Sequence, residues 1–207
     1  MTSVWVGKTF GVNNQAPPFE AEFFGANHIA TTRIHPVPGI DPECCVETGE
    51  GLWKDKIYHF KPDLPPSSGG DEIQTEYFVP SKHCCAALRA LWDRRNVFSH
   101  LVQVTELRMV AADDLPMRPC RGQECVGIHF TWRREFEDVL RVLPEIENVL
   151  EDYDAKPHFG KLFAMNGQRF GELFADDLVS LRERLNNMDP TGKFRNHFMD
   201  TILFDEV

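Results

Sequence analysis

The sequence lacks the short glycine-rich motifs that bind nucleotide phosphates. Neither GxGxxG nor a GxxxxGKS or GxxxxGKT loop occurs among its 207 residues, so the chain shows no nucleotide-binding loop of its own. The GxSxG motif, which presents a nucleophilic serine on a sharp turn, is also absent. These absences argue against a nucleotide-binding domain and against a serine hydrolase.

An excess of basic residues is missing as well. The chain has 22 Lys and Arg against 32 Asp and Glu, a formal net charge of -10. Binding to a phosphate backbone depends on clustered Lys and Arg, so no nucleic-acid partner is expected. No apolar run approaches the roughly 18 residues of a membrane helix. The beginning, MTSVWVGKTF, has neither the basic nor the apolar region of a signal peptide, and we expect a cytoplasmic protein.

The cysteines do not form a CxxC pair. They occur as two adjacent pairs, Cys44–Cys45 and Cys84–Cys85, and as the separated Cys120 and Cys125. Adjacent side chains point to opposite faces of a strand, or about 100° apart on a helix, so neither pair offers two thiolates to one tetrahedral metal ion. We expect no metal site and reduced thiols that pack as small hydrophobic groups.

Length and composition predict one domain, residues 1–207. A chain with 42% hydrophobic residues at this length can bury one sizeable core. Eight of the 14 prolines and eight of the 14 glycines lie in residues 1–70, which we interpret as a loop-rich extension with one short strand, Thr2–Phe10. Because that strand begins without a leader or capping segment, we expect the chain to be a piece of something longer.

Residues 71–164 alternate between strand and helix patterns. Strands are expected at EIQTEYFVP, LVQVTELRMV, ECVGIHFTW and HFGKLFA, and helices at KHCCAALRALWDRR and at a stripe beginning at Phe136. Ser81 is the expected N-cap of the first helix, and Pro144 should kink or restart the second. The order β-α-β-β-α-β predicts an α+β fold, a ferredoxin-like split antiparallel sheet with both helices on one face.

Residues 165–207 are expected to form a C-terminal helix and tail. Leu173, Leu178, Leu181 and Leu185 mark a helix near residues 172–187. The following DPTGKFRNHF carries turn residues rather than a clean helix cap.

Polar side chains are predicted to gather on the sheet face opposite the helices. Side chains alternate across a strand, so Glu106 shares a face with Arg108, and His129 with Thr131. Gln74 and Glu76 oppose the apolar residues of the first strand, and Lys161 lies opposite Leu162. An antiparallel sheet with one solvated face explains this pattern without any function. The assortment of side chains favours a site instead.

Such a set of residues suits a polyhydroxylated ligand. Carboxylate and guanidinium groups bind hydroxyls through charge-assisted hydrogen bonds, and a histidine or lysine beside a reacting hydroxyl can take or stabilise its proton. A hydrolase that uses His129 and Glu106 is a distant alternative, because no nucleophile is placed beside them.

Six blocks of sequence together resemble a known family. They are HPVPG, PSSGGDEIQTEYFVP, TELRMVAADDLPM, GIHFTW, PHFGKLF and DPTGKFRN. In this order they look like the carboxyl-terminal half of flavin-dependent sugar oxidases of the vanillyl-alcohol oxidase superfamily, particularly alditol oxidase and D-arabinono-1,4-lactone oxidase. The resemblance implies a substrate or cap domain whose sheet forms one wall of the active site. Phe159 departs from it, because the family usually has tryptophan there.

The resemblance also implies roles for five residues. Glu106, Arg108 and Thr131 correspond to substrate-binding residues, and Lys161 and His129 to catalytic residues that also lie beside the flavin. The implied reaction oxidises a hydroxyl-bearing carbon by hydride transfer to FAD and reduces oxygen to hydrogen peroxide. The implied substrate is a sugar alcohol or an aldono-1,4-lactone, and membrane association is left open for a lactone oxidase.

The FAD-binding domain that the resemblance implies is absent from this chain. We therefore expect an N-terminal FAD-binding domain in cis or in trans, and weak or no FAD binding by the chain alone. The alternative is a non-catalytic ligand-binding or dimerisation module that keeps the cap-domain fold.

Overall fold

The structure, a computed structural model, describes residues 22–23, 25–27, 35, 51–52 and 72–204. The chain divides into two compact units, residues 1–71 and 72–207. The first contains a short antiparallel hairpin of β1 (Glu22–Phe23) and β2 (Ala26–Asn27). The strand expected at Thr2–Phe10 lies outside the described residues.

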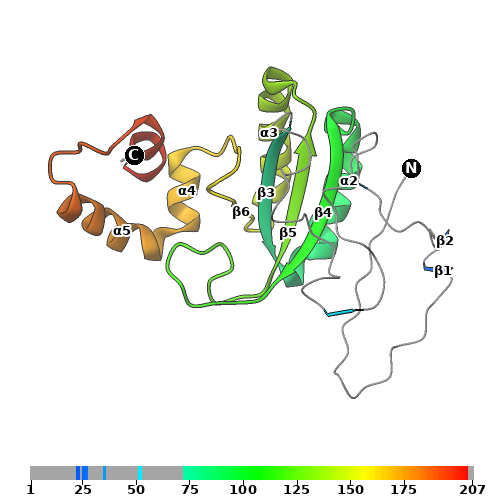
Figure 1. Cartoon of the computed structure of the whole chain (residues 1–207), viewed down its shortest axis with the longest axis horizontal. Helices are drawn as coiled ribbons and strands as arrows, with labels where there is room; N and C mark the ends of the chain where they lie inside the picture. The colour runs from blue at the N-terminus through cyan, green and yellow to red at the C-terminus, as the bar shows by residue number, and fades with distance from the viewer. Residues whose placement is uncertain (1–21, 24, 28–34, 36–50, 53–71, 205–207) are drawn as a thin grey trace, which may run out of the picture. The chain divides into compact units, whose positions relative to one another are not determined.

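The second unit contains the predicted β-α-β-β-α-β core. Its elements are β3 (Ile73–Pro80), α2 (Cys84–Phe98), β4 (Val102–Val110), β5 (Cys125–Trp132), α3 (Phe136–Glu151) and β6 (Lys156–Pro157). The strands pair in the order β4-β5-β3-β6, and every pair is antiparallel. Figure 1 shows α2 and α3 on the same side of this sheet. The predicted ferredoxin-like arrangement is confirmed.

The main hydrophobic core lies between the sheet and these two helices. Every residue of the central strand β5 is buried. Helix α3 contributes Val139, Leu143, Ile146 and Leu150, whose spacing places them on one stripe. We call this side of the sheet the helix face.

The expected N-cap of α2 is wrong, and the expected restart of α3 at Pro144 does not occur. Ser81 does not cap α2 through its side chain; it begins a 3-10 turn, η2 (Ser81–His83), that leads into the helix. Pro144 does not interrupt α3, which continues as one helix across it. The four buried side chains of α3 hold it against the sheet on both sides of Pro144.

The fourth strand is much shorter than the expected HFGKLFA. β6 contains only Lys156 and Pro157. The chain then forms a turn in which the Lys161 N–H donates to the His158 carbonyl at 3.0 Å. Beyond the turn, the Leu162 N–H donates to the Gln74 carbonyl of β3 at 3.0 Å. Lys161 therefore sits in a turn beside the sheet and not in a strand.

The C-terminal part forms two helices where one was expected. They are α4 (Gly167–Leu173) and α5 (Ala175–Met188), and a π-helical turn, η3 (Met199–Leu203), follows. The break falls at Phe174, whose ring stacks on that of Phe170 with centroids 4.7 Å apart. Phe170, Phe174, Leu178 and Ile202 form a second buried cluster. Burial of Phe174 explains why the chain turns between the two helices.

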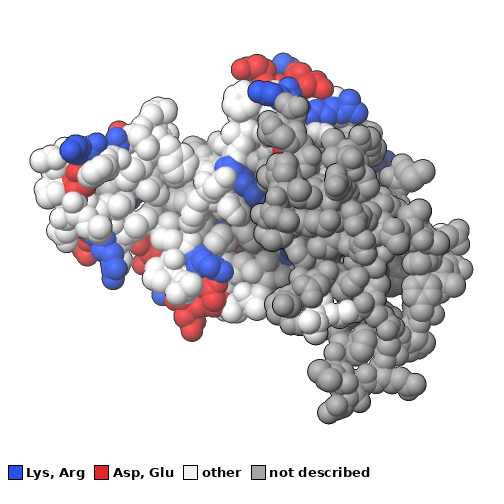
Figure 2. Space-filling view, in the orientation of Figure 1, with Lys and Arg blue, Asp and Glu red and all other residues white. Residues whose placement is uncertain are grey.

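The described surface carries charges of both signs. On the face shown in Figure 2, Lys and Arg side chains occur in small separate groups, several of them next to Asp or Glu. None of the helices among the described residues combines the length and apolar character needed to cross a membrane. The four cysteines in the described part of the chain, Cys84, Cys85, Cys120 and Cys125, are free thiols.

Candidate active site

The register of the three long strands aligns three ionisable side chains. Glu76 of β3 pairs with His129 of β5, and His129 pairs with Glu106 of β4. Because paired residues point to the same side of a sheet, all three project from the face opposite α2 and α3. We call this side the cluster face. It also carries Gln74, Arg108 and Thr131, because each lies two residues along its strand from Glu76, Glu106 or His129.

Glu76 is the centre of the polar cluster. Its Oε2 atom lies 2.6 Å from the Lys161 ammonium, and its Oε1 atom lies 2.9 Å from Nη1 of Arg108. The Glu76 side chain is 6% exposed and that of Lys161 is 18% exposed. Burial alone would raise the pKa of Glu76, but the hydrogen bond and charge of Lys161, together with the charge of Arg108, hold it below its usual value. Glu76 is therefore a carboxylate with two cationic partners.

Arg108 and Glu106 form the more open side of the cluster. The Arg108 guanidinium donates to Glu76 through Nη1 and to Glu106 through Nη2. Its side chain is 43% exposed, and that of Glu106 is 40% exposed. The fork geometry of the guanidinium holds the two carboxylates in a fixed relation. Glu106 and Arg108 are therefore more exposed than Glu76 and Lys161.

His129 is a buried and neutral histidine. Burial and the positive charges of Lys161 and Arg108 lower the pKa of His129 to about 4. Its Nε2 atom lies 3.4 Å from Oε1 of Gln74, so the tautomer with its hydrogen on Nε2 would donate to Gln74. The Nδ1 atom is buried and has no hydrogen-bond partner among the described residues; Glu106 Oε1 lies 3.8 Å from it. In that tautomer Nδ1 is a buried acceptor without a hydrogen-bond partner among the described residues.

Gly127 makes room for the Glu76 carboxylate. A Cβ atom at position 127 would lie 2.8 Å from Oε1 of Glu76. Gly127 faces Arg108 on one neighbouring strand and Phe78 on the other. The absence of a side chain at this position allows Glu76 and Arg108 to meet over the middle of the sheet.

The turn before Lys161 is fixed by the side chain of His158. The Gly160 N–H donates to Nδ1 of His158 at 3.0 Å, and the His158 ring stacks on Phe78 with centroids 6.0 Å apart. The His158 N–H in turn donates to the Glu76 carbonyl at 2.9 Å. These contacts tie the turn to β3, so the ammonium of Lys161 reaches the Glu76 side chain.

The structure brings all the residues singled out in the sequence to one face. Glu106, Arg108, His129 and Lys161 share the cluster with Glu76, and Thr131 lies on the same face, 5% exposed and paired with Gln74. Sequence reasoning placed Glu76 on this face but did not count it as a site residue. The alternation of Glu76 with Tyr77 shows on which face of the sheet Glu76 lies. It does not show that Glu76 pairs with Lys161 and Arg108.

Comparisons with known proteins identify the family. The model of the D-arabinono-1,4-lactone oxidase family matches residues 71–202, a stretch that contains the whole cluster. The chain is 35% identical over 176 residues to an alditol oxidase from a Streptomyces species, which covers 84% of this chain and 42% of that protein. It is 28% identical over 139 residues to an L-gulonolactone oxidase from Scyliorhinus torazame, which covers 63% of this chain and 30% of that protein.

The class of the two relatives and the matching family model agree. Both relatives are oxidases named for a sugar alcohol or a sugar lactone, and the matches fit the carboxyl-terminal part of the vanillyl-alcohol oxidase superfamily. The chain belongs to the D-arabinono-1,4-lactone oxidase family. It spans less than half the length of each of the two relatives.

Proposed function

We propose that this chain is the substrate domain of an FAD-dependent oxidase that acts on an alditol or an aldono-1,4-lactone. The observation that carries the proposal is the buried cluster in which Glu76 joins Lys161 and Arg108 beside an unsatisfied acceptor atom of His129. Membership of a sugar-oxidase family supports it. The distribution of charge on the cluster face suits a neutral ligand with several hydroxyl groups.

Glu106 and Arg108 would hold the substrate hydroxyls. Their side chains are about two-fifths exposed, and both are oriented by their mutual contact. A carboxylate accepts hydrogen bonds from hydroxyls, and a guanidinium donates to them. Thr131 would line the same pocket, because it lies on the same face and two residues from His129.

His129 and Lys161 would act on the reacting hydroxyl. The low pKa of His129, about 4, keeps its ring neutral at physiological pH, so Nδ1 can accept a hydrogen bond from that hydroxyl. The Lys161 ammonium, held by Glu76, would stabilise negative charge on the substrate oxygen as the hydroxyl proton passes to Nδ1 of His129. Preorganisation by Glu76 reduces the rearrangement needed during the reaction.

The donor set also fits the edge of a flavin ring. Lys161 offers a fixed positive charge, and His129 an unsatisfied buried atom. When bound, FAD would supply the two-electron acceptor that takes hydride from the hydroxyl-bearing carbon and then reduces oxygen to hydrogen peroxide. The sequence has no glycine-rich phosphate loop. We therefore propose that an FAD-binding domain, in cis or in trans, holds the nucleotide and that this chain alone binds FAD weakly or not at all.

The test begins with the native protein. An antibody raised against this chain should isolate, from the cytoplasmic fraction of the source cells, a protein or complex that contains FAD and produces hydrogen peroxide with alditols or aldonolactones. Comparison of the two substrate classes then assigns the substrate. A native 207-residue chain that isolates without flavin or a flavin-containing partner would contradict the proposal and favour a non-catalytic ligand-binding or dimerisation module.

A further inference from the structure

Glu147 of α3 joins three parts of the fold on the helix face. Its Oε1 atom accepts a hydrogen bond from the Tyr77 hydroxyl at 2.7 Å and another from the Ala164 N–H at 2.7 Å. Tyr77 belongs to β3 and is 1% exposed, and Ala164 follows the turn that carries Lys161. One carboxylate oxygen thus links a helix, a central strand and the segment after the turn.

This linkage lies directly behind the ion pair of Glu76 with Lys161. Tyr77 follows Glu76 in β3, and successive side chains of a strand point to opposite faces. Glu76 therefore holds Lys161 on the cluster face, while Tyr77 and Glu147 hold Ala164, three residues later, on the helix face. The turn is restrained from both sides of the same strand.

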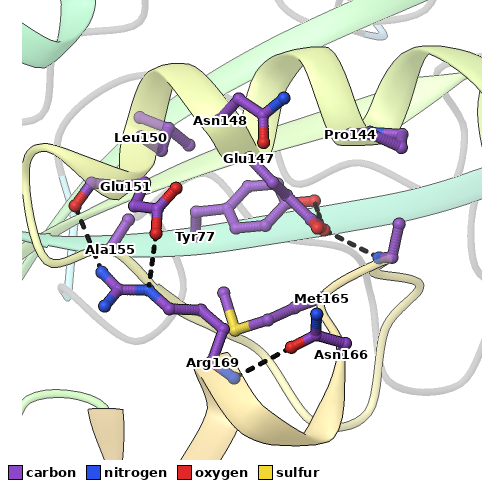
Figure 3. Close-up of a pocket in the computed structure, with 11 residues that line it drawn as sticks. Tyr77, Pro144, Glu147, Asn148, Leu150, Glu151, Ala155, Met165, Asn166 and Arg169 are labelled. Atoms are coloured by element: carbon purple, nitrogen blue, oxygen red, sulfur yellow. Dashed lines mark hydrogen bonds and ion pairs between the residues drawn. The ribbon is translucent and has the colours of Figure 1, made fainter. Parts of the chain in front are cut away.

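Packing leaves space around the same linkage. A pocket of about 260 Å³ is lined by Tyr77, Glu147, Ala164, Met165 and neighbouring residues of α3 and α4. Figure 3 shows the Tyr77 ring and the Glu147 carboxylate side by side at this pocket, with Met165 and Arg169 across from them. Leu162 and Phe163 pack against the core just before Ala164, and at Ala164 itself the bond to Glu147 ties the backbone to α3 beside this space. Both bonds to a carboxylate are of the strong, charge-assisted kind.

We propose that Glu147, together with Tyr77, is a positioning residue that sets the place of the Lys161 ammonium in the cluster and thereby the rate of substrate oxidation. This inference rests on the proposed function for its catalytic part. Glu147 touches neither substrate nor flavin in this proposal; it acts through Ala164 and the turn. A purely structural Glu147 would affect the amount of folded protein and not the reactivity of Lys161.

The first test measures Lys161 directly and needs no flavin. In the 207-residue chain, the acetylation of Lys161 is compared with that of Lys156 in the same molecule by mass spectrometry. Glu147→Leu should raise the ratio of Lys161 to Lys156 labelling several-fold, because a displaced ammonium leaves Glu76. Glu147→Gln keeps an acceptor oxygen for both donors and should leave the ratio unchanged. Glu151→Leu is the matched control: Glu151 lies on the same helix and lines the same pocket, but the hydrogen bonds of Tyr77 and Ala164 go to Glu147.

The second test measures the reaction in the flavin-containing native protein. Glu147→Leu should lower the rate of flavin reduction per bound flavin by about tenfold to a hundredfold, as expected for a displaced catalytic group, with a smaller change in KM. Glu147→Gln should restore it. Tyr77→Phe removes one of the two hydrogen bonds to Glu147 and should lower the rate by a smaller factor. This variant replaces Glu147→Leu in the test if Glu147→Leu does not fold.

The outcomes separate the two proposals. An unchanged labelling ratio in Glu147→Leu and Tyr77→Phe overturns the positioning role whatever the protein catalyses. A raised ratio with an unchanged rate of flavin reduction overturns its part in catalysis. A raised ratio in a protein whose wild type oxidises no alditol or aldonolactone shows instead that the proposed function is wrong.

Discussion

The two faces of the four-stranded sheet use neighbouring residues for different purposes. On the helix face, Tyr77 and Ile128 are at most 1% exposed and pack in the hydrophobic core. On the cluster face, the adjacent Glu76 and His129 are also buried but hold charges and an unsatisfied acceptor atom. Burial of apolar groups stabilises a fold, whereas burial of charged groups is costly unless they are paired. The helix face therefore holds most of the hydrophobic core, and the cluster face holds the candidate site residues.

The largest expected effect is on the cluster face, at Lys161. Under the proposed function, Lys161→Ala should slow flavin reduction per bound flavin by about 10²–10⁴-fold, because it removes a positioned charge beside the reacting hydroxyl. Lys156→Ala is the matched control, since Lys156 belongs to the same segment but lies over the Phe174 ring, 4.7 Å from its centroid. Rapid mixing of enzyme and substrate with absorbance detection of the flavin gives both rates. Near-normal reduction in Lys161→Ala would refute the assigned role.

A substitution on the helix face should reverse this pattern. Leu143 is fully buried in the core, and Leu143→Ala should lower the free energy of unfolding by about 2–5 kcal/mol through lost contacts and a cavity. Flavin reduction per folded, flavin-containing molecule should stay near that of the wild type. Val142→Ala, at a partly buried position of the same helix, should cost less than half as much. Urea denaturation measures the stabilities. A loss of activity larger than the loss of folded protein would show that core packing at Leu143, and not only the linkage of Tyr77 and Glu147, affects the cluster face.

The pH dependence of stability should also depend on the cluster face. The pKa of His129 is about 4 in the fold and 6.5 when unperturbed, so between these values the unfolded chain binds the proton and stability falls as pH falls. Between pH 7 and pH 5 the wild-type chain should lose about 2 kcal/mol more than His129→Gln, by linkage. The pKa of Glu76 is lowered in the fold, so this carboxylate also contributes stability that is lost as the pH falls, at a lower pH than for His129. Urea denaturation at both pH values measures the free energies of unfolding. If wild type and His129→Gln lose the same amount between pH 7 and pH 5, His129 does not titrate in this way.

The long strands were predictable because their alternation continues over eight or nine residues. The register of β3 and β5 follows from burying one apolar face, whereas β4 leaves Leu107 and Met109 exposed. Alternation along each strand was enough to place Glu106 with Arg108, and His129 with Thr131. The break of the last helix at Phe174 did not follow from the sequence, because it depends on contacts with Phe170 in the second core.

The position of Lys161 was predicted for the wrong reason. Alternation with Leu162 assumed a strand, but residues 158–164 form a turn and its exit. Lys161 reaches the cluster through an ion pair with Glu76, 85 residues earlier in the chain. Such a pairing has no local pattern, so the sequence predicted neither the central place of Glu76 in the cluster nor the bonds of Glu147 to Tyr77 and Ala164.

The smallest effect is expected for Gly127→Ala, which adds one methyl group beside the cluster. Gly127→Ala would place a Cβ atom 2.8 Å from Oε1 of Glu76. Two ion pairs hold this carboxylate, so it must move away from Arg108 or Lys161, and we expect a loss of about 1–3 kcal/mol in the free energy of unfolding. Gly171→Ala is the control: no atom lies within 4 Å of its Cβ, and in helix α4 the change should stabilise by up to about 1 kcal/mol. Denaturation curves of both variants decide the point. Equal stability of Gly127→Ala and the wild type would mean that the Glu76 carboxylate is free to adjust, and that its two ion pairs do not fix the geometry of the cluster face.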